Sequence, residues 1–236
     1  MTVSLHQGDC LVTLRGMADN SVDSIVTDPP YGLSFMGKKW DYDVPSVEIW
    51  AECLRVLKPG GHLLAFAGTR TQHRMAVRIE DAGFEIRDMI AWVYGSGFNK
   101  VGYIKDGGGQ HVRKGWGGSL KPALEPITMA RKPLIGTVAA NVLEHGTGAL
   151  NIDGCRVRDG SETGGEKPTY EANNGNAVYG AGMGGGAWRN TQGRWPANII
   201  HDGSSDVVAA FPQAKGPQGA LTGSDPSSKT ANTFGE

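Results

Sequence analysis

Four residues whose types and order suit chemistry stand together where an apolar run ends. Asp28, Pro29, Pro30 and Tyr31 directly follow the run 22–27. A proline fixes φ at about −65°, has no N–H and pushes the residue before it toward extended geometry. The segment therefore predicts a stiff hook that exposes a carboxylate, a backbone carbonyl and a flat ring. Those groups suit a planar target that carries an amino group, and a nucleobase is the obvious candidate.

Elements that could position this hook alternate along the first half of the chain. Strands alternating with helices at this spacing predict an α/β fold with a mainly parallel sheet. Strands are expected at 2–6, 22–27, 62–67, 84–94 and 126–131, and helices at 10–17, 46–57, 71–82 and 137–143. The segment Lys58–Gly61 is expected to stop the second helix.

Three other glycine-containing segments are expected at the same edge of that sheet as the hook. Gly8-Asp9, Phe66–Thr69 and Gly95–Phe98 each follow an expected strand. Ligands of open α/β sheets bind outside the carboxyl ends of the strands. Four such features on one edge predict a cleft there.

The loop 32–43 that follows the hook is rich in aromatic residues. Phe35, Trp40 and Tyr42 could stack on bases, or they could seal the loop itself. From the sequence, sealing is the favoured interpretation.

Composition limits the function classes. The chain has 236 residues and a mean hydropathy of −0.30, with no run of 18 or more apolar residues, so no membrane span is expected. The first residues do not resemble a signal peptide, and a cytoplasmic protein is the default. Three widely spaced cysteines predict neither a disulfide framework nor a metal site. Only eight of the 36 glycines lie in residues 1–90, so the later part is expected to be loop-rich.

Charge is uneven although the net charge is only −1. Residues 99–133 hold seven basic and two acidic side chains, a local excess of five positive charges. Such a patch could meet the phosphates of a nucleic acid, or it could be a solvated loop.

Three segments carry a resemblance to a known family. Gly8–Leu11, Val22–Tyr31 and Leu57–Leu63 resemble the amino-methylating DNA methyltransferases, in the order of their permuted (beta) class. These enzymes transfer a methyl group from S-adenosylmethionine to the exocyclic amine of adenine or cytosine. The resemblance implies a Rossmann-like methyltransferase sheet, mostly parallel with helices on both faces, and a loop-rich C-terminal part. It divides the chain into a catalytic half, 1–134, and a target-recognition segment, 135–236.

The resemblance also implies roles for the residues of the hook. Asp28 and the Pro29 carbonyl would accept the two amine hydrogens, Pro30 would complete the rigid turn, and Tyr31 would stack on a base flipped out of double-stranded DNA.

Other site residues follow from the same resemblance. Asp9 and Cys10, with Asp28, would contact the cofactor, although Asp9 could instead cap the following helix. Phe98 would close the other face of the base or simply pack in its loop. Three basic residues would contact the DNA, namely Lys100, Arg113 and Lys114.

Several alternatives for target and assembly stay open. An Asp before Pro-Pro-Tyr favours adenine-N6 over cytosine-N4, and argues against methylation of a protein glutamine amide. A catalytically incomplete DNA-binding fragment or partner subunit is a further alternative. Either a homodimer or a complementing chain would fit, in a restriction–modification context.

One signature of the resembled family has no counterpart here. Nothing after residue 134 matches the Phe-x-Gly-x-Gly turn that holds the methionine part of the cofactor. Without the strands that carry that turn, two expected strands would have unpaired edges. The sequence therefore predicts a fragment or one half of a split enzyme.

Overall fold

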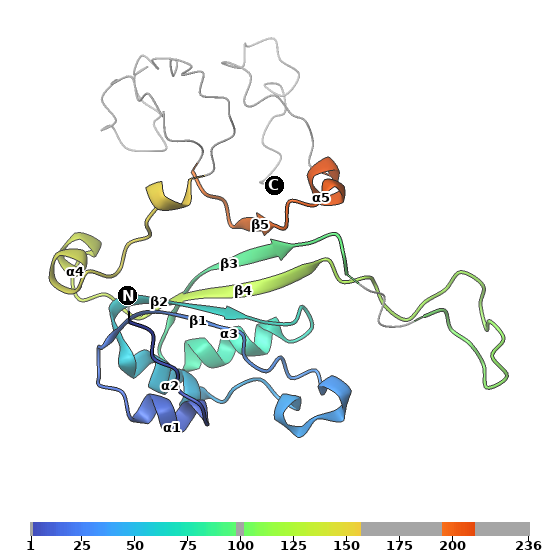
Figure 1. Cartoon of the computed structure of the whole chain (residues 1–236), viewed down its shortest axis with the longest axis horizontal. Coiled ribbons are helices and arrows are strands. Elements are labelled where there is room, and N and C mark those ends of the chain that lie inside the picture. Colours follow the sequence, from blue (N-terminus) through green and yellow to red (C-terminus); the bar gives the residue numbers. More distant parts are fainter. Residues whose placement is uncertain (1, 98–101, 157–194, 211–236) are drawn as a thin grey trace, which may run out of the picture.

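The computed structural model describes residues 2–97, 102–156 and 195–210, and its centre is a five-stranded sheet (Figure 1). The strands lie in the order β1-β2-β4-β3-β5. Their bounds are β1 Val22–Thr27, β2 Leu57–Phe66, β3 Glu85–Val93, β4 Leu124–Arg131 and β5 Ile199–His201.

Strand direction agrees with the expected sheet. The pairs β1–β2 and β3–β5 are parallel, whereas β4 is antiparallel to both of its neighbours. Four of these five strands therefore point the same way. The expected α/β fold with a mostly parallel, Rossmann-like sheet is confirmed.

Two helices cover this sheet because their apolar residues recur at helical spacing. The helices are α1 Cys10–Arg15, α2 Val47–Val56, α3 Gln72–Asp81, α4 Val138–His145 and α5 Ser205–Ala210. Figure 1 shows α1, α2 and α3 together on one side of the sheet. Trp50 of α2 and Met75 and Ile79 of α3 are buried against Leu57 and Leu63 of β2. Burying each such side chain stabilises the fold by about 1.5–3 kcal/mol.

Helix α4 is fastened to the start of β2 by a buried amide. The side chain of Asn141 donates to the carbonyls of Pro59, at 2.9 Å, and Thr147, at 2.8 Å. Its oxygen accepts the N–H of Ile135 at 2.9 Å. Residues 135–147, placed in the second part by the sequence division at 134/135, thus pack on the sheet. That division stays a prediction.

Two expectations for secondary structure are wrong. Residues 2–6 form no strand; Val3 and Leu5 are 80% and 93% exposed, since their alternating pattern meets no neighbouring strand among the described residues. Helix α2 does end just before Lys58–Gly61, as expected, but these four residues lie inside β2, which starts at Leu57 and not at residue 62. Residues 157–194 and 211–236 of the part expected to be loop-rich lie outside the described residues, so that expectation stays a prediction there. Of the helices described, none is long and apolar enough to cross a membrane.

Candidate active site

The register of the sheet brings the hook to the ends of its neighbours. Thr27 of β1 pairs with Ala65 of β2, so Asp28 comes level with the end of that strand. Ala67, the residue directly after β2, donates its N–H to the Pro126 carbonyl of β4 at 3.0 Å. The hook, segment 66–69 and segment 95–97 therefore lie along one edge of the sheet, as expected. The fourth feature, Gly8-Asp9, follows no strand, because residues 2–6 form none, so the sheet does not bring it to this edge.

Tyr31 is the best-fixed side chain of the hook. Burial, a hydrogen bond to Asp28 and the charge of that carboxylate raise the pKa of Tyr31 well above its usual value. Its ring lies against Gly68, where an added Cβ would stand 3.4 Å from Tyr31 Cδ2 and 3.1 Å from Leu33 Cδ1. The Asp28 side chain is exposed. The arrangement thus offers a carboxylate to solvent beside a half-buried, neutral phenol.

Two further residues belong to this group, although sequence reasoning did not single them out. Glu125 and Tyr94 lie near enough to Tyr31 to act on its pKa. Burial and the Glu125 charge raise the pKa of Tyr94. In the sequence, only their positions at the start of β4 and just after β3 could have pointed to them. No motif surrounds either residue.

The loop behind the hook is organised by a buried acid that sequence reasoning also missed. The Asp41 carboxylate accepts the N–H groups of Gly32 at 2.9 Å, Leu33 at 3.2 Å and Phe35 at 2.8 Å. Burial alone would raise the pKa of Asp41, but these hydrogen bonds hold it below its usual value. The aromatic residues do not seal the loop; Asp41 does, and the interpretation favoured from the sequence is wrong.

Asp9 acts locally in the structure. Its carboxylate accepts the N–H groups of Leu11 at 2.9 Å and Val12 at 3.1 Å, so Asp9 is the N-cap of α1. Cys10 is the exposed first residue of that helix. The capping alternative is therefore realised, and contact of Asp9 and Cys10 with a cofactor stays a prediction.

Two of the expected DNA-contacting residues, Arg113 and Lys114, lie on a projecting arm, which we define as residues 102–121 (Figure 1). Bridges between Tyr103 and Gly117 and between Lys105 and His111 hold its two sides together. The guanidinium of Arg113 lies 3.8 Å from the centre of the Trp116 ring, a cation–π contact. Lys114 is exposed beside it. Phe98 and Lys100 lie outside the described residues.

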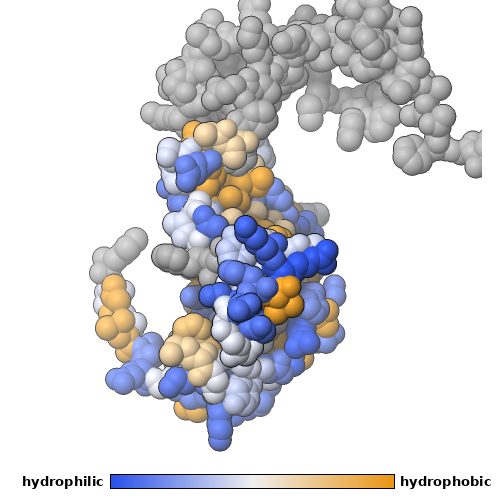
Figure 2. All heavy atoms as spheres, turned by 90° about the vertical axis from the view of Figure 1, so that its right-hand side faces the viewer, coloured by the Kyte–Doolittle hydropathy of each residue, from blue (hydrophilic) through white to orange (hydrophobic). Residues whose placement is uncertain are grey.

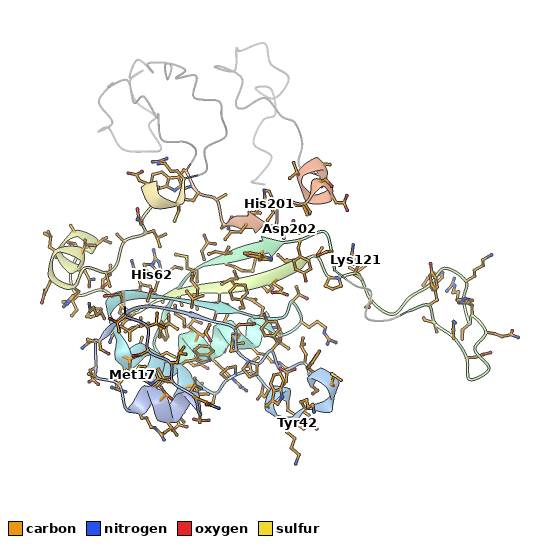
Figure 3. The ribbon with its side chains drawn as sticks, viewed as in Figure 1. Met17, Tyr42, His62, Lys121, His201 and Asp202 are labelled. Atoms are coloured by element: carbon orange, nitrogen blue, oxygen red, sulfur yellow. The ribbon has the colours of Figure 1, made fainter. Side chains whose placement is uncertain are left out.

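The basic patch read from the sequence is not one surface. Lys121 donates to the Gly95 carbonyl at 2.6 Å at the root of the arm (Figure 3). Arg131 pairs with Glu85 at 2.6 Å, and Lys132 donates to the Leu57 carbonyl at 2.7 Å. These three cations hold the fold, so within the described residues the patch reduces to the arm.

A mainly apolar hollow of about 280 Å³ lies at the far side of this edge. It separates the end of β3 from α5 and is lined by Val93, Tyr94, Gly95, Ala123, Asp206, Val207 and Ala210. Tyr94 therefore links the hollow to the group around Tyr31.

Comparison with known proteins agrees with this geometry. The family model for DNA methylases of the N6/N4 methyltransferase type matches residues 22–151. The type II methyltransferase M.HindIII of Haemophilus influenzae is 27% identical over 198 residues, which cover 62% of this chain and 64% of that protein. M.HpaI of Haemophilus parainfluenzae is 33% identical over 104 residues, covering 39% of this chain and 32% of that protein. The chain thus spans less than two thirds of these relatives.

Solved structures of methyltransferases are also similar. M1.HpyAVI in complex with SAM is 18% identical, with a TM-score of 0.35 and coverage of 56% of each chain. The cytosine-N4-specific PvuII DNA methyltransferase is 18% identical, with a TM-score of 0.38, covering 56% of this chain and 50% of that one.

Proposed function

The chain belongs to the N6/N4 family of DNA methylases, and from this premise we propose that it methylates the exocyclic amine of adenine in double-stranded DNA. S-adenosylmethionine is the methyl donor of this family. The observation that carries the proposal is the placement of Asp28 and Tyr31 together at a strand end, with the carboxylate exposed and close enough to raise the pKa of the phenol.

The hook supplies what the amine of a flipped base needs. Adenine's amino nitrogen carries two hydrogens, which the Asp28 carboxylate and the Pro29 carbonyl would accept. Pro29 and Pro30 offer no N–H that would compete for these acceptors. Flipping costs a few kcal/mol, and one aromatic stack returns about 1–3 kcal/mol, so Tyr31 offsets much of that cost.

The described residues fit the acceptor of the methyl group better than the donor. Asp28 is exposed, and Val26 on the same strand is 66% exposed. These residues by themselves leave the space beside the carboxylate open and do not enclose a donor molecule. Asp9, Cys10 and Asp28 are the proposed cofactor contacts, and Asp28 would in addition accept a hydrogen of the target amine.

DNA would be held by the arm as well as by the hook. Every described residue from 102 to 120 is exposed, including Lys105, Arg113 and Lys114. The guanidinium of Arg113 is held over the Trp116 ring, so part of the entropy of that side chain is already lost before DNA binds. Phe98 and Lys100 are proposed to contact the base and the phosphates. A restriction–modification role in the cytoplasm, with a homodimer or complementing chain, is part of the same proposal.

Nucleoside analysis tests the proposal and separates its alternatives. The chain is incubated with labelled S-adenosylmethionine and duplex DNA, which is then digested to nucleosides and resolved by mass spectrometry. We expect labelled N6-methyl-2′-deoxyadenosine. Labelled N4-methyl-2′-deoxycytidine would instead identify the cytosine alternative. Salt-sensitive DNA binding with no labelled nucleoside would identify the binding module.

A further inference from the structure

The loop that follows the hook is held rigidly by the protein. We call residues 32–45 the aromatic loop; it contains the short turns η1 Phe35–Gly37 and η2 Lys39–Asp41. In addition to the three N–H groups that Asp41 accepts, Ser34 donates its N–H to the Asp41 carbonyl at 2.7 Å. At the other end, Arg78 of α3 pairs with Asp43 at 2.7 Å and hydrogen-bonds the Val44 carbonyl. Both ends of the loop are therefore fixed.

Gly32, the first residue of the aromatic loop, packs against the last residues of the same loop. Gly32 has a φ of +67°, and an added Cβ would lie 3.0 Å from the Val44 N and 3.1 Å from the Asp43 carbonyl carbon. Only glycine allows this approach without strain. The loop is thus a closed, compact excursion between the hook and α2.

This rigid loop presents large apolar side chains to solvent. Phe35, Met36, Trp40 and Tyr42 are 58%, 80%, 62% and 57% exposed. Four large apolar side chains exposed within eight residues, Phe35 to Tyr42, are more than isolated surface residues and point to an interaction site. A rigid frame adds to that inference, because aromatic side chains held in place lose little entropy on binding.

The charges of the loop favour one kind of partner. Lys38 and Lys39 are exposed between the aromatic residues. Its two acids are committed to the protein, Asp41 to backbone N–H groups and Asp43 to Arg78. What the loop offers outward is therefore positive charge and aromatic rings, the combination used on nucleic acids.

The position of the loop points to the same partner. It starts directly after Tyr31, and Figure 1 shows it leaving the same end of the sheet as the arm. Figure 2 looks onto this end, where hydrophilic and hydrophobic residues are interspersed. Figure 3 shows Tyr42 on the far side of that end from His201 and Asp202. Loop and arm therefore both leave the end of the sheet at which β1 runs into the hook.

We propose that the aromatic loop is a second DNA-contacting surface, whose rings stack on bases beside the extruded adenine while Lys38 and Lys39 meet the phosphates. The inference rests on the proposed function, because it takes DNA as the substrate. Extrusion of one base leaves its neighbours without a stacking partner, and every base has a face on which an aromatic ring can stack. The arm and the loop then hold the duplex from two directions.

Binding of a fluorescein-labelled duplex of mixed sequence, followed by anisotropy at several salt concentrations, tests the loop without requiring methyl transfer. We expect Trp40→Ala to weaken binding roughly 5- to 150-fold, the loss of one stacked base. The double variant Lys38→Ala/Lys39→Ala should reduce the slope of log K against log salt by about 1.8. All three side chains are exposed, so the variants keep the fold.

Two matched variants serve as controls. Leu143→Ala removes an exposed apolar side chain from α4, and Arg15→Ala removes an exposed cation from α1. Both should bind DNA as the unsubstituted chain does.

Each other outcome overturns the inference. If the unsubstituted chain binds DNA and the loop variants bind equally well, the loop is not a DNA surface, whereas the proposed function stands. If Trp40→Ala abolishes self-association in light scattering and leaves DNA affinity unchanged, the loop is a protein interface. Failure of the unsubstituted chain to bind DNA would overturn both the inference and the proposed function.

Discussion

At the scale of single residues, two aspartates 13 positions apart have opposite tasks because their surroundings differ. Asp28 follows a strand and stays exposed, and its charge helps to raise the pKa of the neighbouring Tyr31 phenol. Asp41 is 3% exposed and accepts three backbone N–H groups. The first is available to a ligand, whereas the second positions the chain around it.

Asp41→Asn tests the positioning role through stability. An amide has one acceptor oxygen where the carboxylate has two, so at least one buried N–H loses its partner. We expect a loss of about 1–3 kcal/mol in the free energy of unfolding at pH 7, measured with urea. Asp23→Asn, at an exposed carboxylate on β1, should change the free energy of unfolding by less than about 0.5 kcal/mol.

The same variant gives a pH dependence whose sign follows from the lowered pKa of Asp41. Below its usual pKa of about 3.9 the unfolded chain binds a proton that the folded carboxylate resists, so folding weakens as pH falls. The stability that Asp41 contributes is therefore complete above that value and lost as pH falls through the lower pKa of the folded state. Unfolding curves of the parent and Asp41→Asn should converge in acid. A constant difference down to pH 2 would contradict this origin.

At the scale of elements, the site exists because a parallel pair of strands ends at one edge. The Thr27–Ala65 pairing brings the hook to segment 66–69, and the two antiparallel pairings of β4 bring Glu125 and Tyr94 to the same edge. Helix α4 secures the other end of β2 through Asn141. The strand pairing of the sheet thus places the site residues at this edge.

Asn141→Ala should loosen that far end. It leaves the Pro59 and Thr147 carbonyls and the Ile135 N–H without their shared partner in a buried place. We expect a loss of about 2 kcal/mol or more in the free energy of unfolding, and earlier hydrogen exchange in α4 than in α3. Leu143→Ala on the same helix is the control, since that side chain is 88% exposed. Equal stability of the two variants would contradict the anchoring role.

The elements also show which features the sequence could predict. Strand β1 appears with the predicted bounds, and α2 and α3 within two residues of theirs, because hydrophobic spacing reports local burial. Segment 2–6 has the alternating apolar and polar residues of a strand but pairs with no strand among the described residues. Its pattern could not predict this, because strand pairing depends on residues far away in the sequence. Asp41 was missed for a related reason, since its role depends on which N–H groups the folded loop turns toward it.

At the scale of the whole molecule, the acceptor site, the aromatic loop and the arm share one end of the sheet (Figure 1). The positive charge that the sequence placed on residues 99–133 divides between the arm and the fold, because Lys121, Arg131 and Lys132 make internal contacts. A protein of net charge −1 can therefore still present a basic surface on the side where its chemistry would occur.

The most direct test of the central claim is methyl transfer from labelled S-adenosylmethionine to duplex DNA by the parent chain, Asp28→Ala and Asp23→Ala. Both aspartates are exposed and come from β1 or its end, but only Asp28 belongs to the hook. We predict transfer by the parent chain and by Asp23→Ala, and a rate at least about 100-fold lower for Asp28→Ala with DNA binding retained. Transfer by Asp28→Ala at the parental rate, or none by a parent chain that binds both DNA and S-adenosylmethionine, would contradict the account.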